Sequence, residues 1–353
     1  MKRAALLFAG QGSQTAGMGG DLCERFEACR NLFIRANEVL GRDIQKICLE
    51  GPEDVLTETD NAQPSIFLTS LACLEALKLQ FPDLRFDATA GLSLGEFTAL
   101  TATEAMSFED GLRMVQMRGR FMREACDATN GGMASIIGMD DAVLVDVCLE
   151  TDVDIANLNC PGQIVISGEK EKIARAIELA KARGAKRAIP LVVAGAYHSR
   201  LMKSAKIKVA NALADLPMRE PKVPVVSNVT ARPAKTVDEI KELLVRQVTS
   251  PVRWSESMQW LIAQGFTRFI ELGPGNVLSG LMKRINQDVE MLSRQRLRNA
   301  RRHRCQADAI GGRLGARLER PIPCFLATIG VDKQRRGWLD RPPWKGSWKT
   351  RWW

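Results

Sequence analysis

The stretch FDATAGLSLGEFTAL, residues 86–100, decides how this chain is expected to fold. Its first half, up to Leu92, is apolar enough for a buried strand, and the residues after Gly95 are typical of a helix start. Glycines two positions before and after Ser93 let the backbone turn sharply, which would hold the serine hydroxyl exposed above a sheet. Glu96 suits the positive end of the following helix. The pattern predicts a nucleophile elbow; the alternative is a tight strand-to-helix turn with an inert serine.

The histidine content narrows the choice of a partner for this serine. The chain has two histidines, and His198 is the only one among the first 293 residues. A serine hydroxyl is a weak nucleophile unless a neighbouring base accepts its proton. A single histidine is often structural, so the hypothesis of a Ser93–His198 pair depends on both residues together and on the segments around them.

Length and composition exclude several classes of protein. At 353 residues and 45% hydrophobic content, the chain can form one large domain or two moderate ones with a sizeable core. It has no run of 18 apolar residues, so we expect no transmembrane helix and no membrane partner. The nine cysteines are scattered without a Cys-x-x-Cys pair, which favours reduced thiols over disulfides or zinc. We therefore expect a cytoplasmic protein without a bound metal.

The net charge of +9 is concentrated at one end of the chain. Residues 294–353 contain 16 Lys or Arg and 4 Asp or Glu, with five of the seven tryptophans, so the first 293 residues are mildly acidic. One interpretation is a nucleic-acid- or membrane-binding appendage, because arginine and aromatic side chains suit phosphates and bases. The favoured interpretation is a non-native or disordered tail, for example a shifted reading frame, because no hydrophobic periodicity is present.

The first 293 residues alternate strand-like and helix-like segments, the pattern of an α/β fold. Residues 129–195 have the order strand–helix–strand–strand–helix–strand of a ferredoxin-like unit. We predict that this small subdomain is inserted into a larger one formed by residues 1–128 and 196–293. The predicted strands are 2–9, 86–92, 133–138, 153–158, 163–168, 186–191, 223–229 and 266–272. The predicted helices are 21–40, 64–81, 107–126, 140–150, 169–183, 199–216, 237–247, 255–264 and 276–285.

Seven segments, taken in order, closely resemble the family of malonyl-CoA:acyl-carrier-protein transacylases and the acyltransferase domains of polyketide synthases. The resemblance covers roughly residues 2–293 and has no counterpart in the tail. The segments are FAGQGSQ (8–14), GLSLGE (91–96), MRG (117–119), NCPGQIVISG (159–168), AYHS (196–199), QVTSPVRW (247–254) and ELGPG (271–275).

The resemblance implies an α/β-hydrolase-like large subdomain with an inserted ferredoxin-like one, and a ping-pong transfer of malonyl from malonyl-CoA to the phosphopantetheine thiol of acyl carrier protein. Ser93 would be the nucleophile and His198 its general base and acid. Gln247 would orient His198 through its backbone carbonyl, in place of the aspartate of a triad. The backbone amides of Gln11 and Leu94 would form the oxyanion hole.

The resemblance also implies which residues choose the substrate. Arg118 would bind the free malonyl carboxylate through two parallel hydrogen bonds, although an arginine on a solvated helix face is the alternative. Tyr197 would leave little room for an α-methyl branch, and simple packing is the alternative. Gln63 and Asn159 would lie near the pocket. Helix capping for Gln63 and a turn of the small subdomain for Asn159 remain open.

The sequence departs from the family pattern at one position, and two other functions are alternatives. The family's most frequent elbow has histidine before the serine, where this chain has Leu92, so the polarity of the pocket is in question. A serine thioesterase or hydrolase with the same elbow is the main alternative, and a scaffold or nucleic-acid binder driven by the tail is the third. Gly10-Gln11-Gly12 lacks the third glycine of a dinucleotide fingerprint. We expect a monomer without a bound cofactor and with little affinity for nucleic acid.

Overall fold

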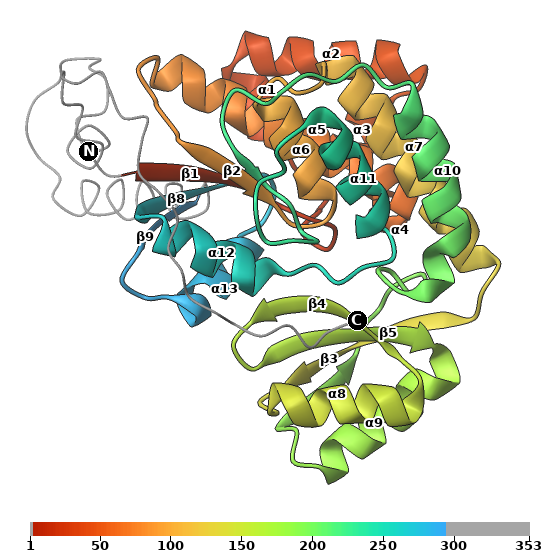
Figure 1. The fold of residues 1–353 in the computed structure, drawn as a ribbon. Helices are drawn as coiled ribbons and strands as arrows, with labels where there is room; N and C mark the ends of the chain where they lie inside the picture. Colours follow the sequence, from red (N-terminus) through yellow and green to blue (C-terminus); the bar gives the residue numbers. More distant parts are fainter. Residues whose placement is uncertain (1–2, 294–353) are drawn as a thin grey trace, which may run out of the picture. The chain divides into compact units, whose positions relative to one another are not determined.

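The computed structural model describes residues 3–293 as a five-stranded sheet with its covering helices and a separate four-stranded sheet (Figure 1). The predicted α/β class is confirmed. The prediction for the tail, residues 294–353, lies outside the described residues. None of the described helices is both long and apolar enough to cross a membrane. The seven cysteines in this part of the chain are buried, and none of them is joined in a disulfide.

The larger sheet is entirely parallel, in the order β7–β2–β1–β8–β9. In a parallel sheet, the carboxyl ends of all strands lie at one edge, where α/β proteins place their sites. The loop 9–13, the elbow at Ser93 and the turn at Asn228 therefore leave the sheet at the same edge. Its strands are β1 (Arg3–Phe8), β2 (Ala88–Gly91), β7 (Val225–Val226), β8 (Phe266–Leu272) and β9 (Glu290–Ser293).

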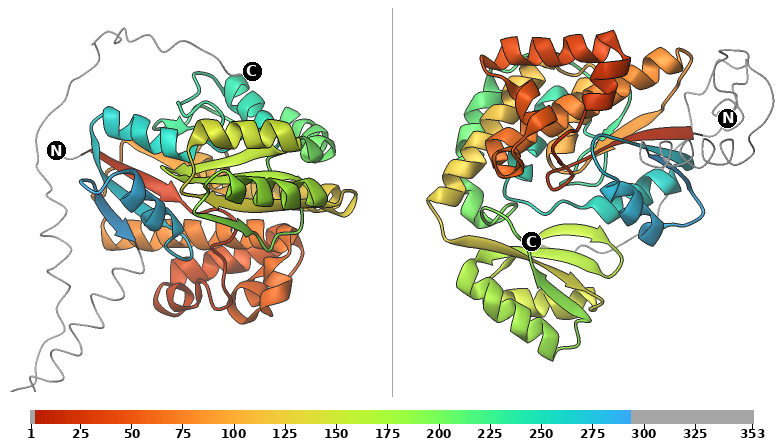
Figure 2. Two further views of the ribbon diagram at one scale, coloured as in Figure 1. Left: turned by 90° about the horizontal axis from the view of Figure 1, so that it is seen from below. Right: turned by 180° about the vertical axis from the view of Figure 1, so that it is seen from behind.

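Alternate residues of β1 enter two different apolar cores, as the period of a strand requires. Leu6 and Phe8 belong to a core that also contains residues of α2, α5, α6, α7, α10 and α11, whereas Ala5 and Leu7 belong to a core that contains residues of α12 and α13. The sheet is thus covered by helices on both faces (Figures 1 and 2). These helices are α2 (Glu27–Leu40), α5 (Thr59–Gln80), α6 (Leu94–Ala102), α7 (Phe108–Asp127), α10 (Lys203–Ala214), α11 (Val237–Gln247), α12 (Trp254–Ala263) and α13 (Val277–Ile285).

Several predicted elements are corrected by the structure. The predicted helix 21–40 is two helices, α1 (Gly20–Arg25) and α2, because Phe26 adopts an extended backbone with φ −130°. The predicted strand 223–229 is only the two residues of β7. The predicted helix 199–216 begins with a 3-10 turn, η1 (Arg200–Met202). The elements that the prediction missed are α3 (Ile44–Glu50), α4 (Glu53–Thr57) and β9.

Helix α5 starts five residues earlier than predicted, so Pro64 lies inside it. A proline has no N–H, and at this position it cannot donate to the carbonyl oxygen of Asp60. The side chain of Arg42 supplies the missing donor, with Nη2 2.9 Å from the Asp60 carbonyl oxygen. A tertiary contact therefore allows the helix to extend past a residue that local rules place at its start.

The smaller sheet has four antiparallel strands in the order β4–β5–β3–β6. Helices α8 and α9 cover one face (Figure 1), where Ala134 and Ile166 are buried with them. Met133 and Val165, on the other face, belong to the same apolar core as Leu6 and Phe8 of β1. The elements are β3 (Gly131–Ile137), α8 (Asp141–Thr151), β4 (Asp154–Cys160), β5 (Gln163–Glu169), α9 (Lys170–Ala182) and β6 (Arg187–Pro190).

Candidate active site

Ser93 occupies a strained turn between β2 and α6, with φ 55° and ψ −104°. Such a backbone is rare for a residue with a side chain and persists only where the surroundings impose it. The flanking glycines are required by close packing. A Cβ on Gly91 would lie 1.9 Å from the carbonyl carbon of Gly95, and a Cβ on Gly95 would lie 2.3 Å from the carbonyl oxygen of Phe8. The turn therefore has no room for a side chain at either position.

The side chain of Asn228 holds this turn. The sequence pattern did not predict this contact. Its Oδ1 accepts a hydrogen bond from the Ser93 backbone N–H at 2.7 Å, and its Nδ2 donates to the Gly91 carbonyl at 2.7 Å. Asn228 is fully buried and follows β7, the neighbour of β2 in the sheet. One amide thus fixes the backbone at Gly91 and at the N–H of the serine itself.

Replacing Asn228 with alanine should lower the free energy of unfolding by about 2–4 kcal/mol, because two buried backbone groups lose their partners. Urea denaturation followed by circular dichroism would measure the loss. Asn211→Ala is the matched control, because Asn211 is exposed on α10 and its replacement should change stability by only about 0.5 kcal/mol. Equal stability of the two variants would show that the amide is not what holds the turn.

Ser93 and His198 meet although they are far apart in sequence. Ser93 Oγ lies 2.8 Å from His198 Nε2, and His198 Nδ1 lies 2.9 Å from the Gln247 carbonyl oxygen. A carbonyl oxygen can only accept, so Nδ1 carries the ring hydrogen and Nε2 presents its lone pair to the serine hydroxyl. Burial and the nearby charge of Arg118 lower the pKa of His198 to about 4. The imidazole is therefore neutral at pH 7 and able to accept a proton.

Arg118 extends from α7 into the same site and is 1% exposed. Its Nη1 donates to Gln63 Oε1 at 2.8 Å, and its Nη2 donates to Gln247 Oε1 at 2.9 Å and to Ser93 Oγ at 3.0 Å. Its Nε is buried without a hydrogen-bond partner within residues 3–293. Burial lowers its pKa to about 10, so the guanidinium stays charged at neutral pH.

All three hydrogen-bond acceptors of Arg118 are neutral. A buried cation is normally paired with an anion, because desolvation without pairing is costly. The guanidinium also lies over the ring of Phe97, 5.4 Å from its centroid, which compensates only part of the charge. The site can therefore bind an additional anionic group beside the serine hydroxyl.

Glu96 is an acidic residue whose charge acts on this guanidinium, and the sequence pattern predicted only a role at the helix start for it. It is 3% exposed, and its Oε2 accepts from Gln247 Nε2 at 2.6 Å and from the Asn228 backbone N–H at 3.1 Å. Burial raises its pKa to about 7, although these hydrogen bonds and the charge of Arg118 oppose the rise. The position of Glu96 three residues after the serine was the only signal in the sequence.

Two segments next to the serine each contain a backbone N–H group without a described acceptor. Leu94 is the first residue of α6, and Gln11 lies in the loop after β1. Neither backbone N–H donates to another residue within the described part of the chain. The loop packs closely on the elbow, because a Cβ on Gly10 would lie 2.5 Å from the Leu92 carbonyl oxygen. Two free donors are thus available beside the nucleophile, as an oxyanion hole requires.

The structure places the other predicted site residues as follows. The buried Gln63 contacts Arg118 directly. Tyr197 is buried beside His198, hydrogen-bonds through its hydroxyl to Thr59 Oγ1 at 2.5 Å, and also contacts the Gln11 side chain. Asn159 is half-buried in β4, and no described hydrogen bond joins it to the Ser93 cluster.

Comparisons with known proteins agree on one family. Residues 5–305 match the acyl transferase domain family. The chain is also 47% identical over 298 residues to the malonyl CoA-acyl carrier protein transacylase of Bacillus subtilis strain 168, a match that covers 83% of this chain and 93% of the relative. The chain belongs to the acyl transferase family. Within that family, it is similar to the malonyl CoA-acyl carrier protein transacylases.

Solved structures of this acyl transferase branch have the same fold. An acyl carrier protein S-malonyltransferase from Vibrio cholerae is 39% identical with a TM-score of 0.79, covering 82% of this chain and 96% of that one. A malonyl-transacylase solved in complex with a type II polyketide acyl-carrier protein is 38% identical with a TM-score of 0.80, covering 82% and 95%. The parallel sheet with helices on both faces is therefore the fold of the family.

Proposed function

We propose that this protein transfers a malonyl group from malonyl-CoA to the phosphopantetheine thiol of acyl carrier protein through a malonyl-serine intermediate. The observation that carries the proposal is the buried guanidinium of Arg118, which donates to the nucleophile Ser93 and has only neutral hydrogen-bond acceptors. A free carboxylate on the acyl group would complete this site. The similarity to malonyl CoA-acyl carrier protein transacylases supports the same donor and acceptor.

In the first half-reaction, Ser93 Oγ attacks the thioester carbonyl and His198 Nε2 accepts the hydroxyl proton. The backbone N–H groups of Gln11 and Leu94 donate to the oxyanion of the tetrahedral intermediate. As the intermediate collapses, the C–S bond breaks and the proton on Nε2 passes to the departing CoA thiolate. The Gln247 carbonyl keeps the imidazole in the required tautomer and stabilises its charged form.

In the second half-reaction, the phosphopantetheine thiol gives its proton to His198 Nε2 and attacks the malonyl-serine ester. Collapse of the second intermediate returns the proton to Ser93 Oγ and releases malonyl carrier protein. Arg118 positions the acyl group in both steps by holding its carboxylate. Gln63 orients Arg118, and Tyr197 restricts the space at the α-carbon. A place for Asn159 near the pocket stays a prediction, and a role in the turn of the small sheet is its alternative.

The acid limb of the pH profile should be unusual for an enzyme with a histidine base. Because the pKa of His198 in the free protein is lowered to about 4, kcat/KM for acylation of Ser93 by acetyl-CoA, which has no carboxylate, should stay constant as the pH falls from about 8 to 5 and be lost below about 4. Steady-state rates in constant-ionic-strength buffers would measure this, with circular dichroism at each pH to verify folding. A fall in this kcat/KM near pH 6.5, the ordinary pKa of histidine, would contradict the assignment.

The proposal extends to the domain organisation. Residues 1–128 and 196–293 would form an α/β-hydrolase-like catalytic subdomain, and residues 129–195 an inserted ferredoxin-like one. The strand order β4–β5–β3–β6 with antiparallel neighbours supports the second assignment, since a split βαβ unit pairs its strands in this way. A cytoplasmic location and a monomeric state are part of the same proposal.

A serine thioesterase is the second candidate, because it would use the same serine and histidine. Intact-mass measurement distinguishes the two. After mixing with malonyl-CoA, the protein should gain the mass of one malonyl group, and after addition of holo carrier protein it should lose that mass to the carrier. Release of most of the malonyl group as free malonate, while holo carrier protein is present, would overturn the transferase assignment.

A further inference from the structure

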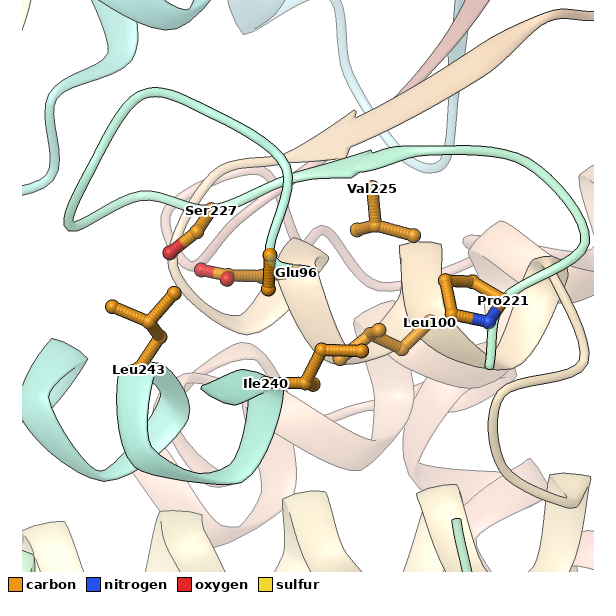
Figure 3. Close-up of a pocket in the computed structure, with 8 residues that line it drawn as sticks. Glu96, Leu100, Pro221, Val225, Ser227, Ile240 and Leu243 are labelled. Atoms are coloured by element: carbon orange, nitrogen blue, oxygen red, sulfur yellow. The ribbon is translucent and has the colours of Figure 1, made fainter. Parts of the chain in front are cut away.

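Glu96 is a buried carboxylate that the proposed mechanism does not use. Both of its described donors, Gln247 Nε2 and the Asn228 backbone N–H, bind the same oxygen, Oε2. The carboxylate also points toward the Ser227 hydroxyl, with which it shares a side-chain hydrogen bond (Figure 3). The other oxygen, Oε1, takes no part in the hydrogen bonds from Gln247 and Asn228, so it can carry a proton while both of these are kept.

The side-chain amide of Gln247 links Glu96 to the substrate-binding arginine. Its Nε2 donates to Glu96 Oε2 and to the Ser93 carbonyl oxygen at 3.0 Å, whereas its Oε1 accepts from Arg118 Nη2. If the amide were reversed, its NH₂ group would face the guanidinium and its oxygen would face the carboxylate, so both contacts would become repulsive. Glu96 thus determines that Gln247 presents an acceptor to Arg118.

A small cavity of about 10 Å³ is lined by Glu96 and Ser227 but not by Ser93 (Figure 3). This is about the size that holds one water molecule, which could exchange a proton with the carboxylate. Apart from Glu96 and Ser227, the residues that line it are apolar: Leu100, Pro221, Val225, Ala234, Ile240 and Leu243.

We propose that Glu96 is a positioning residue for the malonyl carboxylate, holding Gln247 against Arg118 and taking up a proton from solvent when that carboxylate binds the guanidinium. The inference rests on the proposed function, because it requires an acyl group with a negative charge. Without substrate, ionised Glu96 partly compensates the charge of Arg118. When the malonyl carboxylate binds, one guanidinium would face two buried anions. Glu96 then becomes neutral, because its Oε1 can take up a proton. The proton leaves again when the acyl group departs.

Few other groups near Glu96 titrate in the relevant range. Helix α7 contributes Arg118, which remains charged, and the loop before η1 contributes His198, whose pKa lies near 4. The segment after β7 contributes Ser227 and Asn228, and α11 contributes Gln247. None of these three side chains ionises in this range. A binding effect between about pH 6 and 9 therefore reports on Glu96.

The sign of the effect follows from competition for one cation. At low pH, Glu96 is protonated and Arg118 is free to pair with malonyl; at high pH, ionised Glu96 competes with malonyl. The ratio of kcat/KM for Ser93 acylation by malonyl-CoA to that by acetyl-CoA should therefore fall about tenfold from pH 6 to 9 in the unmodified protein, which corresponds to a change of one unit in the pKa of Glu96 on binding. Acetyl-CoA carries the same CoA groups and lacks the carboxylate, so their titration cancels in the ratio.

The test compares this ratio in three variants. In Glu96→Gln, which mimics the protonated state, the ratio should stay near its low-pH value throughout. In Ser227→Ala, loss of the hydrogen bond that favours the anion should move the fall to higher pH. Glu271→Gln is the matched control, because Glu271 is also a buried carboxylate but binds the start of α13 at Leu278 and Ser279, so its profile should be that of the unmodified protein.

A pH dependence of the ratio in Glu96→Gln that parallels the unmodified protein would overturn the inference. A purely structural role for Glu96 would change the rates for both thioesters equally at every pH, leaving the ratio unchanged. If Glu96→Gln does not fold, as judged by circular dichroism, the shift expected in Ser227→Ala decides the question. Failure of the proposed function is separate, because the unmodified protein would then form no malonyl adduct on Ser93 at any pH.

Discussion

Replacing Ser93 with alanine is expected to abolish the malonyl adduct and to lower malonyl transfer by a factor on the order of 10⁴ or more. The Ser93 hydroxyl contacts both His198 Nε2 and the guanidinium of Arg118. Alanine lacks the oxygen that forms the ester, and no other described hydroxyl contacts His198 Nε2. Intact-mass measurement after mixing with malonyl-CoA would test this directly.

The fold should tolerate this substitution, so loss of the adduct can be assigned to chemistry. Alanine is smaller than serine, and the backbone contacts of Asn228 to the turn do not involve the side chain of residue 93. Ser255→Ala, in the first turn of α12, is the control and should be acylated normally. A malonyl adduct that survives in Ser93→Ala and maps to another residue would reassign the nucleophile.

Periodicity and turn residues were enough to predict most of the fold. The bounds of α11 and β8 agree with the prediction, because each has a clear hydrophobic pattern and a definite start and end. The break at Phe26 and the extension of α5 through Pro64 were not predictable, since they depend on contacts made elsewhere in the chain. The strand order β7–β2–β1–β8–β9 also depends on tertiary packing.

The strand order explains which parts of the site the sequence missed. The motif around Ser93 and the uniqueness of His198 pointed to the central pair, and Arg118 came from the resemblance to a family. Asn228 has no motif of its own, and it reaches the elbow only because β7 lies beside β2. Glu96 was interpreted through the helix dipole, whereas its burial and its contact with Gln247 depend on the placement of α11.

Replacing Arg118 with alanine should separate recognition of the malonyl carboxylate from the chemistry at the serine. We expect kcat/KM for malonyl-CoA to fall by a factor on the order of 10² to 10³, because two charge-assisted hydrogen bonds of about 1.5–3 kcal/mol each are lost, partly offset by the relief of a buried charge. Acetyl-CoA has no carboxylate, so its slow acylation of Ser93 should change by less than about tenfold. Single-turnover acylation with both thioesters would measure the two effects.

A lysine at this position tests the geometry of the contact. Arg118→Lys keeps the positive charge but lacks the planar fork, which binds Gln63, Gln247 and Ser93 simultaneously. If charge alone selects malonyl, this variant should retain most of the preference for malonyl-CoA over acetyl-CoA; if the fork is required, the preference should approach that of Arg118→Ala. Equal losses of kcat/KM for the two thioesters in Arg118→Ala would mean that Arg118 only supports the side chains around it. The preference for malonyl-CoA would then have to come from another cation.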